Sequence, residues 1–244
     1  MRETPAKVLK KRRSVIVALL LVVFLFLGIQ PDLLREEQQT ETTEQISVLS
    51  ESVEGSERAL EVLERIEVKG RAPKTGYSRA QFSDGWGSVG GCDLRNIMLA
   101  RGMTEIKLAE DGCIVLRGTL NDPYTGNVIE FIRGGSTSGD VQIDHVVALS
   151  DAWQKGAQEI GEENRFKLAN DPLNLLAVDG PANQQKGDSD AASWLPPYKP
   201  FRCMYVARQI AVKDKYSLWI TEAEKSAMKR VLNGCGEQVV PISN

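Results

Sequence analysis

The sequence is poor in the residues that most catalytic centres use. Only one of its 244 residues is a histidine, His145, so chemistry that needs a base titrating near neutral pH must use this imidazole. The chain contains no Gly-x-Ser-x-Gly segment, which disfavours a serine hydrolase. It contains no Cys-x-x-Cys pair either, which disfavours a zinc ribbon or a dithiol redox motif.

An excess of positive charge is also missing. The formal net charge is −3, and from Pro73 onward 19 Lys and Arg stand against 21 Asp and Glu. A protein that coats nucleic acid by charge alone should be markedly basic, so this class is disfavoured. Positively charged residues are nevertheless concentrated in the C-terminal region. This concentration predicts either a surface that binds a phosphate backbone or a helix surface that faces solvent. The residues are Lys186, Lys199, Arg202, Arg208, Lys213, Lys215, Lys225, Lys229 and Arg230.

The N-terminal segment has the pattern of a membrane-directing sequence. A basic stretch within residues 1–14 precedes the apolar run from Val15 to Ile29. We predict that residues 1–14 are a cytoplasmic tail and that residues 15–30 are a transmembrane anchor or the core of a cleaved signal peptide. The run is short for a bilayer span of about 20 residues, although flanking cations can extend it. In either case the remainder of the chain lies outside the cytoplasm.

The rest of the chain divides into a linker and a folded domain. Residues 31–56 are rich in Glu, Gln, Thr and Ser and lack aromatics, so we predict a flexible acidic linker. Residues 57–244 form the predicted domain, which opens on a short helix because Leu60, Leu63 and Ile66 recur at helical spacing.

The cysteines indicate an oxidising environment. Cys92, Cys113, Cys203 and Cys235 are even in number and allow three pairings. We predict the pairing that is local in sequence, Cys92 with Cys113 and Cys203 with Cys235. Closing each loop contributes roughly 3 kcal/mol to the stability of the fold.

Hydrophobic patterning predicts a mixed α+β domain. Two apolar segments, 113–120 and 127–132, flank a turn-rich stretch and indicate a β-hairpin. A strand follows that ends near His145, and a second short apolar run covers 173–178. Helices are expected from Pro181, over 202–213, and over 221–233, where Thr221 begins a capping box.

Three short motifs carry the chemistry. Asp144 and His145 end the strand that follows the hairpin, and Asn174 lies in the apolar run 173–178. Asn183 precedes Lys186 by three residues within Asn-Gln-Gln-Lys-Gly-Asp. In this order the motifs resemble those of the HNH (His-Me finger, ββα-metal) endonucleases, of the secreted or membrane-anchored bacterial type related to the HNH domain of modification-dependent restriction endonucleases. The resemblance implies a ββα-metal core at 141–190, an N-terminal β-hairpin extension and C-terminal helices.

The resemblance also implies a role for each residue. His145 would accept the proton of the attacking water, and Asn174 would orient the imidazole. Asp144 and Asn183 would bind one divalent ion, and oxygen ligands favour Mg²⁺ or Mn²⁺. Lys186 would contact a substrate phosphate. Because neighbouring side chains of a regular strand point to opposite faces, a bend after Asp144 is expected. The family's usual third histidine is absent, which disfavours tight binding of zinc.

The function expected from these motifs is an extracytoplasmic, metal-dependent endonuclease. DNA is the favoured substrate, with weak sequence preference because no separate base-reading module is evident. We expect a monomer that meets the membrane only through its N-terminal segment. The alternative is a surface-anchored binding protein on an HNH scaffold that has lost catalysis.

Overall fold

The computed structural model describes residues 57–134 and 139–242, which belong to one compact unit. The predicted basic tail, apolar segment and acidic linker (1–14, 15–30 and 31–56) lie outside the described residues. Within the described ranges, no helix combines the length and the apolar character that crossing a membrane requires.

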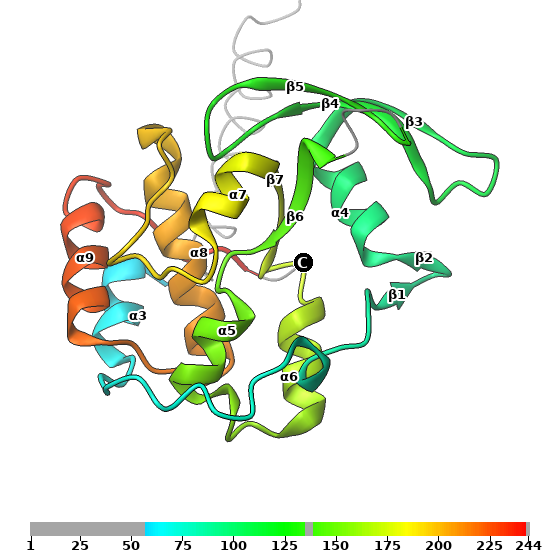
Figure 1. Cartoon of the computed structure of the whole chain (residues 1–244). Coiled ribbons are helices and arrows are strands. Elements are labelled where there is room, and N and C mark those ends of the chain that lie inside the picture. Colours follow the sequence, from blue (N-terminus) through cyan, green and yellow to red (C-terminus); the bar gives the residue numbers. More distant parts are fainter. Residues whose placement is uncertain (1–56, 135–138, 243–244) are drawn as a thin grey trace, which may run out of the picture. The chain divides into compact units, whose positions relative to one another are not determined.

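The unit is mixed α+β, as predicted, and an antiparallel strand pair lies near its centre (Figure 1). Strands β6 (Val141–His145) and β7 (Leu175–Asp179) pair in continuous register, from Val141 opposite Asp179 to His145 opposite Leu175. Helix α7 (Gly180–Lys186) follows β7 directly. The Asp179 side chain caps it by accepting from the Ala182 amide, and a proline stands in the first turn.

Gly180 is required at the junction of β7 and α7. A Cβ atom at this position would stand 2.4 Å from the Gly139 carbonyl oxygen, which is closer than any side chain tolerates. The amide of Gly180 also donates to the Asp140 carbonyl, 2.8 Å away. The start of β6 and the start of α7 therefore lie in direct contact.

One face of the β6–β7 pair is covered by a helix and a second sheet. Alternate residues Val141, Ile143, Leu175 and Ala177 pack in one hydrophobic cluster with residues of α4 (Leu94–Gly102) and of that sheet. The sheet has the order β3–β4–β5, formed by Met103–Leu108, Val115–Asn121 and Val128–Ile132. The predicted hairpin is thus confirmed as β4–β5, but it is part of a three-stranded sheet.

Strand β3 escaped prediction because its residues carry little apolar alternation. The Met103 side chain is buried, the next four side chains are exposed, and the Leu108 side chain is partly buried. Glu105 has a positive φ of 50°, and the pairing with β4 shifts between Thr104 and Lys107. An irregular edge strand of this kind lacks the period of two that sequence patterns detect.

The other face of the pair meets three helices. Val178 and Ala182 pack with buried residues of α3 (Ala59–Arg65), α8 (Arg202–Lys215) and α9 (Glu222–Leu232). Thr221 caps α9 by accepting from the Glu224 amide, as the capping box predicted. These three helices lie together in Figure 1, on the side of β6–β7 away from α4.

A third hydrophobic cluster lies beside the end of β6. It includes residues of α5 (Leu149–Ala152), the π-helical segment η3 (Trp153–Ala157) and α6 (Gly161–Asn170), and Phe82, which follows η1 (Arg79–Gln81). Two short strands, β1 (Ser88–Val89) and β2 (Cys92–Asp93), precede α4, and η4 (Lys199–Phe201) precedes α8. Helix α6 was not predicted from the sequence; its only buried residues are Leu168 and Ala169, in its last turn.

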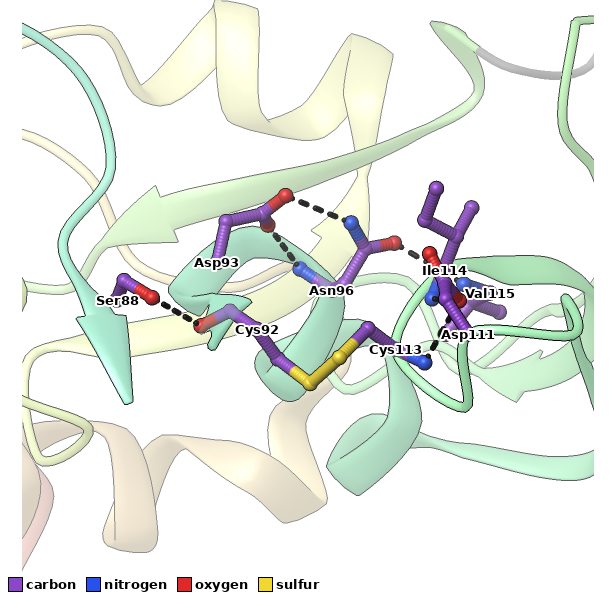
Figure 2. The surroundings of a disulfide bond; sticks show 8 residues. All are labelled: Ser88, Cys92, Asp93, Asn96, Asp111, Cys113, Ile114 and Val115. Carbon is purple, nitrogen blue, oxygen red and sulfur yellow. Dashed lines mark hydrogen bonds between the residues drawn. A yellow bond between two sulfur atoms is a disulfide. The ribbon is translucent and has the colours of Figure 1, made fainter. Parts of the chain in front are cut away.

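Both predicted disulfides are confirmed. Cys92 and Cys113 join β2 to the segment before β4, and Figure 2 shows how hydrogen bonds order both ends of this bridge. The Asp93 side chain caps α4 through the Asn96 amide, while Asp111 accepts from the amides of Cys113 and Ile114. The second bridge, Cys203–Cys235, joins α8 to the segment after α9.

Candidate active site

His145 ends strand β6 and has a defined hydrogen-bond partner. Its Nε2 atom lies 2.9 Å from the backbone carbonyl oxygen of Ala169, in the last turn of α6. A carbonyl can only accept, so Nε2 carries the proton and Nδ1 of the neutral ring keeps its lone pair. The ring lies parallel to that of Trp86, with 6.0 Å between the centroids. The imidazole is therefore held with one nitrogen prepared to accept a proton.

Burial keeps this imidazole neutral. The side chain is almost fully enclosed, and burial lowers the pKa of His145 to about 4. The hydrogen bond to Ala169 acts in the opposite direction, and the positive charges of Arg79 and Lys186 lower the pKa further. Such a histidine is uncharged at neutral pH, which is the state a general base requires.

Asp144 lies on the other side of the strand from His145. One carboxylate oxygen accepts from the Tyr124 hydroxyl at 2.5 Å, and the other accepts from the Lys186 ammonium at 3.0 Å. Burial raises the pKa of Asp144, although Lys186 and Tyr124 both favour its charged form. The expected bend after Asp144 is absent, since β6 pairs with β7 in unbroken register through both residues. That expectation was wrong: paired strands keep the ordinary alternation of side chains.

Helix α7 brings Asn183 and Lys186 to the same side of β6 as Asp144. The Asn183 amide donates to the Gln142 side-chain oxygen at 2.9 Å, and Gln142 stands two residues before Asp144. Lys186 is only 1% exposed and also donates to the His145 carbonyl at 2.9 Å. The structure therefore directs its ammonium inward to Asp144 and to the backbone of His145.

Asn174 acts on the backbone around the histidine. Its side-chain oxygen accepts from the Val147 amide at 2.8 Å, and its side-chain nitrogen donates to the carbonyls of Val147 and Leu168. Leu168 immediately precedes Ala169, which holds the imidazole. This fully buried side chain thus ties the segment that follows β6 to the helical turn that fixes the ring.

Three further residues of the site were missed by sequence reasoning. Ala169 contributes a backbone carbonyl, which leaves no signature in a side-chain pattern. Tyr124 lies in the stretch predicted to be a turn, yet it is fully buried and bonded to Asp144. Trp86 follows a glycine in a segment with no regular period. Only Tyr124 had a usable signal, because an aromatic residue is unusual in an exposed turn.

Two side chains of this region carry oxygen atoms that could bind a divalent metal ion. Asp144 supplies a carboxylate and Asn183 an amide, both at the interface of β6 and α7, and this chemistry suits a hard divalent cation. In the described ranges no three His, Cys, Asp or Glu side chains gather as a metal-binding group. Lys186 already supplies a positive charge to Asp144. A divalent ion would therefore share this carboxylate with Lys186.

Comparison with known proteins relates most of the domain to restriction enzymes. Residues 99–231 match the family model of the C-terminal domain of GmrSD restriction endonucleases. A protein of Arthroderma benhamiae, described as an uncharacterized secreted protein, is 36% identical over 187 residues, which cover 75% of this chain and 88% of that protein. No solved structure matches the chain.

Proposed function

The chain belongs to the family of GmrSD restriction endonuclease C-terminal domains, and on this premise we propose that it is a nuclease that hydrolyses phosphodiester bonds of nucleic acid. The observation that carries the proposal is the hydrogen bond between Nε2 of His145 and the Ala169 carbonyl. It leaves Nδ1 as the basic atom of a neutral, buried imidazole. The β6–β7–α7 order, with Asp144 and His145 on the first strand and Asn183 on the helix, supports a ββα-metal core.

In the proposed reaction, Nδ1 of His145 takes a proton from a water molecule. The resulting hydroxide oxygen forms a bond to phosphorus, and the bond from phosphorus to the leaving 3′ oxygen breaks. Asn174 and the Ala169 carbonyl position the ring for this step by fixing the backbone and the Nε2 proton. General-base catalysis of this kind contributes typically 10²–10⁴-fold to a rate.

We further propose that Asp144 and Asn183 hold one divalent ion, Mg²⁺ or Mn²⁺. Because Asp144 and His145 point to opposite sides of β6, this proposal requires the end of the strand to rearrange when ion and substrate bind, so that both act on one phosphate. When bound, such an ion supplies Lewis-acid stabilisation to a phosphate oxygen and to the leaving group. Asp144 must then turn part of its coordination away from Lys186, which is 3.0 Å away. Lys186 and the ion would then share Asp144, and we propose that the Lys186 ammonium, which also donates to the His145 carbonyl, contacts a substrate phosphate.

The proposed working place is outside the cytoplasm. The matched Arthroderma benhamiae protein is described as secreted, and both pairs of cysteines form disulfides, which persist in oxidising compartments. We propose DNA as the preferred substrate and a monomeric chain. Whether residues 15–30 remain as an anchor or are cleaved decides between a membrane-attached and a released enzyme.

A second function has its own supporting observation. His145 is only 7% exposed and Asp144 only 6%, and both oxygens of Asp144 are occupied. A closed site of this kind also suits a binding protein on the same scaffold without catalysis. A nuclease would cleave nucleic acid repeatedly and the binding protein would not, so cleavage distinguishes the two functions.

Plasmid nicking with and without EDTA separates them. We expect metal-dependent nicking by the full chain, and its loss in His145→Ala. His145→Gln is the matched control, because its amide can still donate to the Ala169 carbonyl but cannot accept a proton from water. Both variants should lack nicking, and His145→Gln should keep the circular-dichroism melting curve. Wild-type nicking in either variant would remove His145 from the mechanism, and no nicking by the wild type with any metal would favour the binding protein.

A further inference from the structure

The crowded cations of the C-terminal region separate into two groups in the structure. Five of the nine form ion pairs with carboxylates: Lys186 with Asp144, Lys213 with Asp151 and Glu224, Lys215 with Asp171, and Lys225 and Lys229 with Glu64. Of the other four, Arg208 donates to the carbonyls of Pro172 and Leu173, and the remaining three are Lys199, Arg202 and Arg230. In the described part of the chain none of these three makes an ion pair with a carboxylate.

The three remaining cations line one pocket. It has a volume of about 590 Å³ and lies between the segment 191–195, the start of α8 and the last turn of α9. Arg202 comes from the first position of α8 and Arg230 from α9, while Lys199 comes from η4. No aspartate or glutamate is among the lining residues. The pocket is thus a hollow of one charge sign in a domain that is slightly acidic.

A disulfide and a hydrogen bond hold the walls of this pocket in place. Cys203, the residue after Arg202, lines the pocket and is bonded to Cys235, which follows α9. The Arg202 side chain also donates to the Pro196 carbonyl at 2.7 Å, which fixes its direction. Three positive groups around one hollow, with no carboxylate among its lining residues, attract a negatively charged ligand.

One wall of the pocket is in contact with the candidate active site. Trp194 lines the pocket, and its indole nitrogen donates to the Gln185 side chain in α7 at 3.3 Å. Its ring packs edge-to-face against Tyr124, with 5.0 Å between the centroids, and Tyr124 donates to Asp144. A ligand in the pocket would therefore contact Trp194, whose indole bonds to the helix that carries Asn183 and Lys186.

We propose that this pocket binds a backbone phosphate of the nucleic-acid substrate, away from the bond that is cleaved. The proposal rests on the proposed nuclease function and names a second contact with its substrate. A nucleic-acid strand is the occupant that fits, because it presents phosphates at regular intervals and the pocket is connected through Trp194 to α7 and to Tyr124, the partner of Asp144. Lys199, Arg202 and Arg230 neutralise the phosphate, and binding gains from the release of its counterions.

The test measures binding separately from cleavage. The full chain in detergent micelles, with His145→Gln to stop turnover, is titrated onto a fluorescein-labelled double-stranded oligonucleotide, and fluorescence anisotropy gives the Kd. Replacing Lys199, Arg202 and Arg230 together by Gln should raise the Kd about tenfold near 0.1 M salt. The slope of log K against log salt concentration should fall by about 1 for each phosphate that the variant no longer neutralises.

A matched variant controls for net charge. Arg101, Lys107 and Arg117 are also exposed and have no ion pair among the described residues, but they lie on α4, β3 and β4. Replacing these three by Gln should change the Kd much less. Equal effects in the two variants would overturn the proposal, as would an unchanged salt slope in the pocket variant. So would loss of binding to soluble short-chain phosphatidylserine with DNA binding intact, which would assign the pocket to lipid headgroups. Plasmid nicking by the wild type checks the nuclease function independently.

Discussion

At the scale of single residues, the protonation of His145 is the feature on which the chemistry depends. The hydrogen bond to Ala169 fixes the tautomer, and burial holds the pKa near 4. The chain has one histidine, so its imidazole signals in a nitrogen–proton NMR spectrum need no assignment. We expect a protonated Nε2 and an unprotonated Nδ1 at pH 7, with titration near pH 4. A ring that titrates near 6.5 would contradict the burial of His145, and a proton on Nδ1 would contradict its role as the base.

The same histidine makes stability depend on pH. Its folded pKa of about 4 lies below the value near 6.5 expected in an unfolded chain. Between these values the unfolded state binds more protons, so the contribution of the neutral ring is complete above pH 6.5 and declines as the pH falls toward 4. The sequence located this residue, but its pKa depends on enclosure by Trp86 and α6, which no local pattern contains.

A second prediction at this scale concerns the ligand role of Asn183. Removing its amide oxygen with Asn183→Ala should raise the Mn²⁺ concentration needed for half-maximal nicking. Asn183→Asp adds a charge while keeping an oxygen in the same position, so it should lower that concentration. Isothermal titration calorimetry of Mn²⁺ gives a readout without substrate, and the Kd should follow the same order. Identical titrations for all three proteins would reject the ligand role.

At the scale of elements, the site is a junction between β6, the segment after it and the end of α6. Asn174 makes three side-chain hydrogen bonds across this junction and is fully buried. Sequence reasoning assigned it an orienting role, and the structure adds that this role passes through Val147 and Leu168. The helix that supplies the Ala169 carbonyl was not predicted, because its apolar residues are confined to one turn.

Asn174→Ala should therefore loosen the junction and displace the imidazole. The buried Val147 and Leu168 backbone groups lose their partners, which costs about 2–4 kcal/mol of unfolding free energy. Chemical denaturation followed by tryptophan fluorescence measures this loss. The His145 titration should also move upward, because the ring becomes more solvated. A variant with lowered stability but an unchanged His145 titration would limit Asn174 to a structural role.

At the scale of the whole molecule, a buried network of charges joins elements that are distant in sequence. The fully buried Lys155 lies 2.7 Å from Asp151, 2.8 Å from Asp190 and 2.6 Å from Glu224. Lys213 of α8 pairs with Asp151 and with Glu224 of α9, and Arg71 closes the group. Burial acts to raise the pKa of Asp190, but Lys155, Ser193 and Arg71 together outweigh it and the pKa is lowered. The network thereby connects α5, α8, α9 and the segment that follows α7.

Sequence patterns predicted the helices that carry Lys213 and Glu224, yet the network itself could not be foreseen. Lys213 stands in a stretch that fits a solvated surface equally well, and Asp190 follows a motif assigned to the active site. Lysine and aspartate are seldom fully buried, so the ordinary expectation places them in water. Their pairing depends on the packing of α8 against α9 and of both helices on η3, and this packing is a property of the complete fold.

Removing the central cation should destabilise the whole domain. Lys155→Met keeps the length of the side chain but leaves Asp151, Asp190 and Glu224 without their shared partner, and breaking a buried ion pair in this way costs about 3–5 kcal/mol. Lys167→Met is the control, because Lys167 pairs with Glu163 on the exposed face of α6 and such pairs are screened by solvent. Denaturation midpoints of the two variants should differ widely. Equal midpoints would mean that the network stabilises the fold no more than a surface pair does.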